Sequence, residues 1–513
     1  MNNLKKTTTG KGNNDYDHVI KRVEKWMETK ETRIAGCEGA QVKARIIQRI
    51  VEITNKEYTQ QVINRNNGVL SPLSSSTEVI NAGGLRICMA TGKLSISPRL
   101  WLINFIYFFG SWLQLLMELV LGIFKKSPPH SSTPTILMEA GGGFEESDFR
   151  FVRFCREGPI APLASAKPLI VNTQRLPRKT TNSNFIYTSR PLIYLMNNLL
   201  QRSVRVSLLF RHMTAPFYYL QALIVCPVNV LISRDLSVIP IFRLLDRENL
   251  IEAMIVTTSF FSSQPLWMNG LANQHFKLHM LWYSQNFIPK VYIGEEERSN
   301  LPGARHMRVD VHWVWSEGFK SYLRELGQTS EIRIVGPILW YLPEKITGFG
   351  KDCIKVAVFD ITPLPDGETA FGAVKNYYSV STIKKFVTDI VEICDDIAAA
   401  SEKEVLILLK HKRVTLNNHH DSSYLDFLEQ MVKIKPNFKL IDHQTNLFGL
   451  LEECHLSVAV PYTSTVFVAA AVAKPTIYYD SFAELIPLYE KNKFVHFAAG
   501  KEQLKELMYR SLT

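Results

Sequence analysis

The segment that most constrains the fold is residues 456–480, LSVAVPYTSTVFVAAAVAKPTIYYD, near the end of the 513-residue chain. The apolar run at 456–460 is typical of a buried parallel strand, and it leads into a hydroxyl-rich turn, a helix of small residues and a second strand. The residues of the turn are Pro461, Tyr462, Thr463, Ser464 and Thr465. Because ligands of open α/β sheets bind at the carboxyl edge, this turn is a candidate phosphate site.

Strands and helices alternate through the rest of this region. Apolar runs predict strands at 354–359, 405–409 and 438–441. An amphipathic helix lies between the first two strands, with apolar residues at helical spacing from 383 to 397 and with Ser381 as its predicted N-cap. Alternation over this length predicts a parallel, Rossmann-like sheet.

Polar residues follow these predicted strands. Asp360 and Thr362 follow the first strand, and Asp480 ends the strand after the hydroxyl-rich turn. The basic run after the second strand consists of Lys410, His411, Lys412 and Arg413. Since the carboxyl ends of parallel strands share one edge of a sheet, one bound nucleotide could contact all of these side chains.

Each of these positions also has a simpler interpretation. The basic run could be an ordinary solvated loop. Ser464 or Thr465 could be a helix cap, and Asp360 could cap the turn before Pro363. The coincidence of several strand ends, rather than any single residue, favours a ligand site.

Several of these segments resemble those of a known family. The segments VAVFDITPLPDG, LLKHKR and VAVPYTSTVFVAAAVAKPTIYYD are similar to the carboxyl-terminal half of bacterial polysaccharide biosynthesis proteins named for a Pro-Phe-Thr-Ser motif. In this chain Tyr462 replaces the phenylalanine, which keeps a flat ring and could add a hydrogen bond. Segments at 141–160 and 261–286 also resemble the family, so the likeness covers about two thirds of the chain, from roughly residue 136 onward.

The resemblance implies a glycosyltransferase of the GT-B kind, with two Rossmann-type domains, acting on surface carbohydrate. It implies a nucleotide sugar as co-substrate, no cofactor and no metal. Lys410, Lys412 and Arg413 would neutralise the leaving nucleotide. The remaining expected donor-binding residues are Asp360, Thr362, His411, Pro461, Tyr462, Thr463, Ser464, Thr465 and Asp480.

The preceding half of the chain is expected to hold the acceptor and the general base. Its predicted strands are 136–139, 251–257, 279–283 and 309–315. Glu146 and Asp148, after a Gly-rich turn, are the preferred candidates for the base that takes the acceptor proton. They could instead form an acidic helix start, and nearby arginines could neutralise them.

A second candidate group in this half is Trp282, Tyr283, Gln285 and Asn286. Aromatic faces and planar amides commonly hold carbohydrate, so the four residues could form an acceptor wall. Alternatively, the two aromatic residues belong to the core and only the two amides reach solvent.

Residues 100–124, LWLINFIYFFGSWLQLLMELVLGIF, are long and apolar enough to cross a bilayer, and basic residues flank them on both sides. Asn104, Gln114 and Glu118 make a span imperfect. We therefore expect association with a membrane surface, with a helix hairpin at Gly110-Ser111 as one way to achieve it. The net charge of +11 is compatible with an anionic lipid surface.

Five segments are predicted. They are a charged, mainly helical extension (1–97), a hydrophobic membrane-associating segment (98–127), a linker (128–135), an acceptor domain (136–345) and a nucleotide-sugar-binding domain (346–513). A Gly- and Pro-rich stretch at 336–350 is the expected hinge. Within the extension, helices are predicted around 19–27 and 42–53, for docking a partner or as a structural cap.

The cysteine spacing and the polar start of the chain indicate the expected cellular compartment. Its seven cysteines have no disulfide-framework spacing and its polar start has no signal core, so we expect the cytoplasm, at the inner face of the cytoplasmic membrane. No nucleic-acid-binding motif accompanies the basic charge, and nucleic acid is not an expected partner.

The alternative to an enzyme is a non-catalytic membrane-associated scaffold of a polysaccharide assembly complex.

Overall fold

The structure is a computed structural model of the chain. It describes residues 11–66, 79–88, 90–126, 133–138, 144–164, 168–172, 185–284, 291–294, 302–346, 348–350, 352–363, 379–411, 421–487 and 492–512. Of these, it describes the backbone alone at 11–17, 55–66, 144–149, 259 and 302–303.

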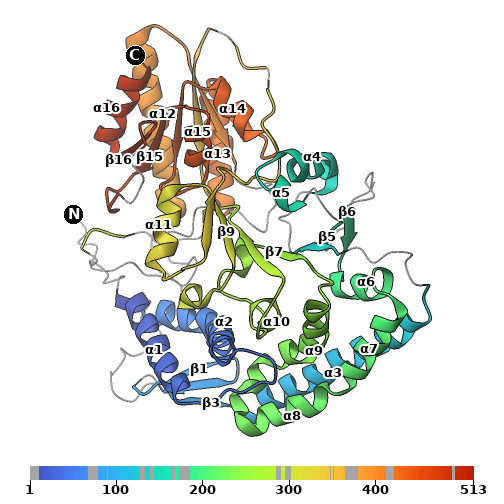
Figure 1. Ribbon diagram of the computed structural model, residues 1–513. Helices are drawn as coiled ribbons and strands as arrows, with labels where there is room; N and C mark the ends of the chain where they lie inside the picture. Colours follow the sequence, from blue (N-terminus) through green and yellow to red (C-terminus); the bar gives the residue numbers. More distant parts are fainter. Residues whose placement is uncertain are drawn as a thin grey trace.

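A seven-stranded parallel sheet forms the centre of the first α/β domain (Figure 1). Its order is β10-β9-β8-β7-β4-β5-β6. Most of its residues are buried, as expected for a parallel sheet covered on both faces. The strands are β4 (Thr135–Leu137), β5 (Leu169–Asn172), β6 (Phe185–Thr188), β7 (Ala253–Thr257), β8 (Lys277–Leu281), β9 (Val311–Val314) and β10 (Glu331–Ile334).

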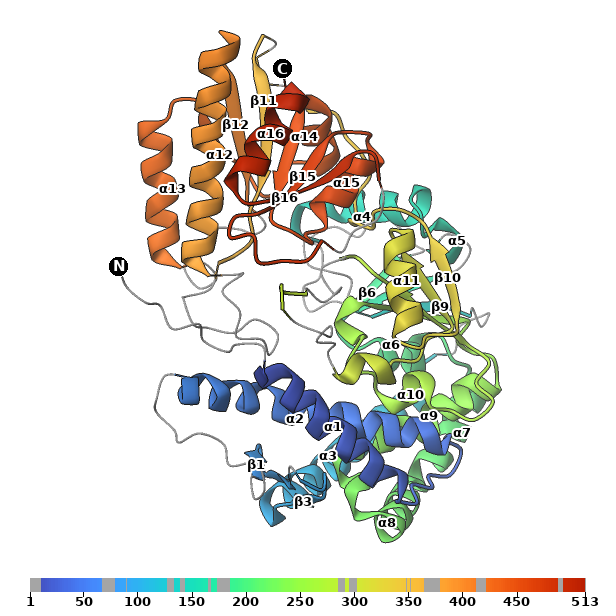
Figure 2. The ribbon, with the colours of Figure 1, turned by 90° about the vertical axis from the view of Figure 1, so that its left-hand side faces the viewer.

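A six-stranded parallel sheet forms the second domain, which lies above the first in both views (Figures 1 and 2). Its order is β13-β12-β11-β14-β15-β16. The central strands β11 and β12 are apolar and buried on both faces. The strands are β11 (Ile354–Phe359), β12 (Val405–Lys410), β13 (Phe438–Ile441), β14 (Leu456–Ala459), β15 (Thr476–Asp480) and β16 (Val495–Ala499).

Both sheets have the doubly wound arrangement. In each, the first strand of the domain pairs with the second on one side and with the fourth on the other, β4 with β5 and β7, and β11 with β12 and β14. The order therefore reverses at the first strand, and ligands of such sheets bind where it reverses. The expected GT-B-like pair of Rossmann-type domains is confirmed.

Helices pack on the faces of these sheets or on one another. In the first domain they are α4 (Phe144–Glu157), α5 (Ala161–Ala164), α6 (Pro191–Asn198), α7 (Arg202–Met213), α8 (Ala215–Val225), η1 (Pro227–Ile232), α9 (Ser233–Arg247), η2 (Thr258–Phe260), α10 (Leu266–Asn269), η3 (Pro302–His306) and α11 (Glu317–Glu325). In the second they are α12 (Val380–Ser401), α13 (Ser422–Ile434), α14 (Leu447–Glu453), α15 (Thr465–Ala471) and α16 (Lys501–Leu512).

Helix α12 confirms the predicted amphipathic helix but corrects its start. Its N-cap is Ser379, whose hydroxyl accepts a hydrogen bond from the backbone N–H of Thr382. Ser381, the predicted cap, lies inside the first turn, 3.0 Å from the Ser379 hydroxyl. The earlier serine takes the role because an N-cap accepts from the N–H two or three residues ahead.

The amino-terminal extension packs against the first domain. Helices α1 (Lys11–Glu28) and α2 (Gly39–Asn66) cover the predicted helical stretches and bury their apolar residues in the same core as α9. The buried Arg45 donates to Asp235 of α9 at 2.7 Å and to Glu52 at 2.7 Å. These contacts give the extension a structural role. The extension also contains a small antiparallel sheet that was not predicted, β1 (Val79–Ala82), β2 (Leu85–Cys88) and β3 (Leu94–Ile96).

The hydrophobic segment forms one unbroken helix, α3 (Pro98–Ile123), capped by the Ser97 hydroxyl. The suggested hairpin at Gly110-Ser111 is wrong. The helix is long and apolar enough to cross a membrane by length and composition. However, a stripe of residues along its length, from Asn104 to Gly122, is buried against protein.

The predicted hinge lies between the last strand of the first sheet and the first strand of the second. In its described part, Ile338 is fully buried in a core that contains Trp313 of one domain and Phe448 of the other. The Leu342 carbonyl also accepts a hydrogen bond from Asn446 at 3.0 Å. Closure about this stretch stays a prediction.

Candidate active site at the carboxyl edge of the second sheet

The site is built where the order of the second sheet reverses. Phe359, the last residue of β11, pairs with Lys410 of β12 on one side and with Ala459 of β14 on the other. The segments that follow these three strands therefore start side by side. This adjacency is the one expected from the sequence.

Asp360 is the centre of a buried polar cluster. Its carboxylate accepts a 2.8 Å hydrogen bond from the Tyr424 hydroxyl and lies 3.3 Å from Nδ1 of His411. Tyr424 is fully buried, and burial, reinforced by the neighbouring carboxylate, raises the pKa of its phenol well above the usual value. Asp360 thus links the end of β11 to the end of β12. These contacts are additional to the turn-capping role considered from the sequence.

Lys410 places an ammonium group beside this cluster. Its Nζ donates to the backbone carbonyl of His443 at 2.6 Å. Burial lowers the pKa of Lys410 to about 8, against the opposing effect of Asp442 and Asp360. A half-buried lysine that keeps its charge near neutral pH is suited to bind an anion.

Thr362 carries a buried hydroxyl that has no hydrogen-bond partner among the residues that the structure describes. It lies three residues beyond the end of β11. Because buried polar groups are nearly always paired, an unpaired hydroxyl beside the switch point is consistent with a ligand-binding role.

The motif turn after β14 is held by its own hydrogen bonds. Tyr462, which follows Pro461, has a φ of 64°, a left-handed conformation that is rare for an aromatic residue. Its hydroxyl donates to the Ile486 carbonyl at 2.7 Å, which is the added hydrogen bond that phenylalanine lacks. The Thr463 hydroxyl lies 3.2 Å from that of Thr465.

Ser464 precedes α15 but does not cap it with its side chain. Its hydroxyl lies 3.3 Å from that of Ser284, which follows β8 of the first domain. Ser464 thus stands at the N-cap position without a capping hydrogen bond from its side chain. The contact also brings the carboxyl edges of the two sheets together at the motif.

Asp480 ends β15 with a buried side chain. Its carboxylate accepts hydrogen bonds from the backbone N–H groups of Phe482, Glu484 and Leu485, at 3.2, 2.7 and 2.8 Å. These bonds shape the loop that meets Val291 and Ile293 of the first domain. A contact of Asp480 with the donor stays a prediction.

Several predicted site residues lie outside the described residues. They are Lys412, Arg413, Gln285 and Asn286. Glu146 and Asp148 lie near the start of α4, where the structure describes the backbone alone. A helix start is what the alternative interpretation expected there, and the role of these two carboxylates as a base stays a prediction.

Trp282 requires a correction. Its side chain is 1% exposed, its indole Nε1 donates to Nδ1 of His312 at 3.1 Å, and its ring packs on Phe319. It belongs to the core because Phe319 of α11 packs on its ring, so it offers no face to an acceptor. Tyr283 is half-buried and remains available for that role.

Two threonines at the reversal point of the first sheet were not predicted. Thr257 ends β7 and Thr258 follows it, and the hydroxyl of each is buried without a partner among the described residues. The sequence signal was an apolar strand running into polar hydroxyl residues, as the strand at 456–460 also does. The two hydroxyls lie at the carboxyl edge of the first sheet, the edge at which ligands of such sheets bind.

An apolar cavity of about 300 Å³ lies between α3, α6, α9 and the first sheet. Met138, just beyond β4, and Trp267 line it, and Arg190 and Arg234 supply guanidinium groups.

Among the described residues, no cluster of three or more His, Cys, Asp or Glu side chains has the arrangement of a metal site.

Comparisons with solved structures find distant similarities. The wall teichoic acid polymerase TagF is 10% identical, with a TM-score of 0.35 and coverage of 74% of this chain and 78% of TagF. UDP-GlcNAc 2-epimerase of Methanocaldococcus jannaschii is 10% identical, with a TM-score of 0.37 and coverage of 74% and 92%. S. aureus TarM is 11% identical, with a TM-score of 0.32. The similarity covers 54% of this chain, which thus spans about half of TarM, 52% of its length.

These TM-scores are too low to support an argument about function. No curated protein sequence matches the chain. The family model of the polysaccharide biosynthesis PFTS motif proteins, however, matches residues 218–508, which includes the motif at 461–464. The match starts later than the predicted likeness but covers more than half of the chain, and the chain therefore belongs to the polysaccharide biosynthesis PFTS motif protein family.

Proposed function

We propose that this protein is a metal-independent glycosyltransferase that moves a sugar from a nucleotide-sugar donor to a growing surface polysaccharide or lipid-linked glycan. The observation that carries the proposal is the meeting of Thr362, Lys410 and the 461–465 turn where the second sheet reverses its order. Membership of a polysaccharide biosynthesis family supports the same chemistry.

The donor phosphates would be held by the hydroxyl cluster of Thr463, Ser464 and Thr465. Negative charge develops on the leaving nucleoside diphosphate as the bond to the sugar breaks. The basic run from Lys410 to Arg413 would neutralise that charge, and groups already held in place do so without reorganising. No divalent ion is needed for this role, so a chelator should leave transfer unchanged.

The acceptor would bind at the facing edge of the first sheet. Its hydroxyl must lose a proton as it attacks the sugar, and Glu146 or Asp148 would take that proton. Tyr283, Gln285 and Asn286 would hold the acceptor sugar. The 3.3 Å approach of Ser284 to Ser464 supports transfer between these two edges.

The enzyme would act at the inner face of the cytoplasmic membrane. The apolar cavity beside α3 favours the lipid-linked form of the acceptor, because its lining suits a hydrocarbon chain and its two arginines suit a lipid-linked phosphate. The apolar surface of α3 supports contact with lipid.

Thermal stabilisation by nucleotides tests the donor site. The purified protein is heated with a panel of nucleoside mono- and diphosphates and nucleotide sugars, and ligands that bind the native state raise its melting temperature. Saturable stabilisation by one nucleotide class is expected, with loss in Ser464→Ala and Lys412→Ala. Lys433→Ala, on the exposed surface of α13, is the control for removal of a lysine.

Polymer production in cells separates an enzyme from a scaffold. Lys412→Ala should lower transfer by about 100-fold, the usual scale for losing one group that stabilises a leaving anion. Normal polymer production by a stably folded Lys412→Ala variant, together with no stabilisation by any nucleotide, would favour the scaffold.

A further inference from the structure

Helix α3 is paired along its length with α7 and α8, which run in the opposite direction. Near one end, the buried Arg205 of α7 donates to the carbonyls of Gly122 and Lys125 at the end of α3. In the middle, Trp112 Nε1 donates to the His212 carbonyl and His212 Nε2 to the Trp112 carbonyl, both at 2.9 Å. These contacts define an antiparallel pair, with α3 on one side and α7 followed by α8 on the other.

The outer surface of this pair is apolar. On α7 and α8, an exposed stripe at spacings of three and four residues includes Phe217 and Ile224, which are 69% and 84% exposed. On α3, Ile106 and Met117 lie on a similar stripe, and Phe124 beyond its end is 80% exposed. Most of the exposed large hydrophobic side chains among the described residues lie on these three helices. A contiguous surface of this kind marks an interaction site.

The packing of the pair favours lying in the plane of a bilayer over crossing it. One side of α3 is buried on protein along its length, and crossing would carry the paired helices into the hydrocarbon with it. Arg211 would then lie in the membrane interior, where a charge is strongly unfavourable. Lying in the interface buries the apolar stripes and leaves the arginine at headgroup level.

The exposed charges on these three helices and at the ends of α3 have one sign. Arg99 and Lys125 flank α3, and Arg202 and Arg211 belong to α7, all exposed. The only acidic residue of the three helices, Glu118, is paired inward with Asn197 at 3.3 Å. This arrangement is complementary to anionic lipid and unfavourable for self-association through the same face.

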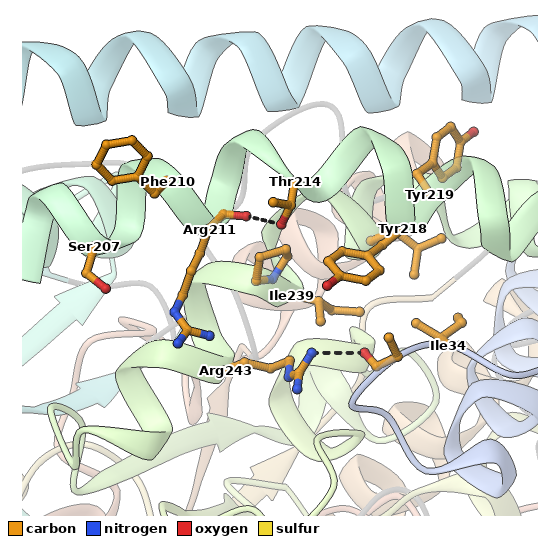
Figure 3. A pocket seen from close by; sticks show the side chains of 12 residues that line it. Ile34, Ser207, Phe210, Arg211, Thr214, Tyr218, Tyr219, Ile239 and Arg243 are labelled. Carbon is orange, nitrogen blue, oxygen red and sulfur yellow. Dashed lines mark hydrogen bonds between the residues drawn. The ribbon is translucent and has the colours of Figure 1, made fainter.

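A cavity of about 450 Å³ opens beside this surface, between α7, α8, α9 and the segment before α2 (Figure 3). Phe210 and Tyr218 line it and also belong to the exposed apolar surface. The Arg211 side chain lines the cavity from α7 and the Arg243 side chain lines it from α9 (Figure 3). Arg243 donates to the Ala35 carbonyl at 3.3 Å, and no carboxylate is paired with either guanidinium among the described residues.

We propose that α3, α7 and α8 lie in the surface of an anionic bilayer and that Arg211 and Arg243 hold the phosphate of a lipid headgroup in the adjoining cavity. The inference rests on the membrane association included in the proposed function. Two guanidinium groups in one cavity can bind a phosphate with several charge-assisted hydrogen bonds. Together with the apolar stripes, they provide the two signals that stable membrane attachment requires.

Vesicle flotation of the full chain tests the proposal. The vesicles consist of phosphatidylcholine alone or of phosphatidylcholine mixed with phosphatidylglycerol. The wild-type protein should prefer the mixed vesicles. Phe217→Ser combined with Ile224→Ser should lower partitioning to both by at least about tenfold, from the apolar area removed. Ile434→Ser, a 69% exposed residue on α13, should have no effect.

The cavity is tested by Arg211→Gln, which should lower the preference for phosphatidylglycerol by about fivefold, the scale for one cation at a membrane surface. Lys433→Gln on α13 is the matched control. Equal preference in the wild type and Arg211→Gln would refute the phosphate site. Wild-type protein that does not float with either vesicle would refute the membrane surface. An apolar variant that changes from dimer to monomer without any vesicle binding would assign the surface to a second copy.

The same preparations separate this inference from the proposed function. Nucleotide-induced thermal stabilisation should be unchanged in the Phe217/Ile224 and Arg211 variants, because these residues lie in the first domain and away from the second sheet. Stabilisation without vesicle binding would refute only the membrane surface. Vesicle binding without stabilisation would refute only the donor site.

Discussion

Replacing Tyr424 with phenylalanine should selectively destabilise the second domain. The Tyr424 hydroxyl is 2.8 Å from the Asp360 carboxylate, and both side chains are buried. A hydrogen bond to a charged group contributes about 1.5–3 kcal/mol. Phenylalanine removes only the hydroxyl, so packing is kept. We expect Tyr424→Phe to lower the free energy of unfolding of this domain by about 2 kcal/mol.

Amide hydrogen exchange is the suitable assay, because all eight tryptophans precede residue 341 and tryptophan fluorescence does not report on this domain. Exchange in peptides of β11 and β12 should accelerate about 30-fold, the equivalent of 2 kcal/mol. The control is Tyr478→Phe, whose hydroxyl donates to the neutral Thr463 carbonyl at 3.0 Å and should matter less. Equal acceleration in the two variants would refute a special role for the buried carboxylate.

Three further results are expected. Nucleotide affinity measured by calorimetry should fall as the pH rises through about 8, where Lys410 loses its charge, whereas Lys410→Arg should keep its affinity; pH-independent binding would contradict this. Burial lowers the pKa of His279 and His312 to about 4 from 6.5, so the unfolded state binds more protons between these values. The stability of the first domain should therefore be complete above pH 6.5 and fall towards pH 4, by about 3 kcal/mol for each histidine, as monitored by tryptophan fluorescence; a flat profile would contradict it. Tyr462→Phe should lower the free energy of unfolding by about 1 kcal/mol through loss of the Ile486 hydrogen bond, without changing nucleotide affinity; loss of binding would place the hydroxyl in the donor site.

The layered fold could be predicted because buried parallel strands leave apolar runs. Strands β11, β12, β14 and β15 were each predicted in this way. The strand β10 left no such signal, because it is an edge strand whose residues are mostly exposed. Strands β5 and β6 have four residues each, too few for periodicity to distinguish them from a short helix segment.

The candidate site was predictable in its position but not in its hydrogen bonds. Strand adjacency follows from the order of a doubly wound sheet, which placed Asp360 near Lys410. The contact of Asp360 with Tyr424 joins positions 64 residues apart and depends on how α13 packs. Trp282 shows the same limit, since its burial depends on α11, an element that the local pattern does not reveal.

A donor nucleotide is expected to bind where the second sheet reverses its order. Hydrogen exchange of the full chain, with and without the nucleotide that stabilises it most, tests this directly. Exchange should slow in peptides covering 360–363 and 461–465 of the wild type, and this slowing should be absent in Ser464→Ala. Slower exchange confined to the first sheet, or unchanged exchange at both segments with saturating nucleotide, would contradict it.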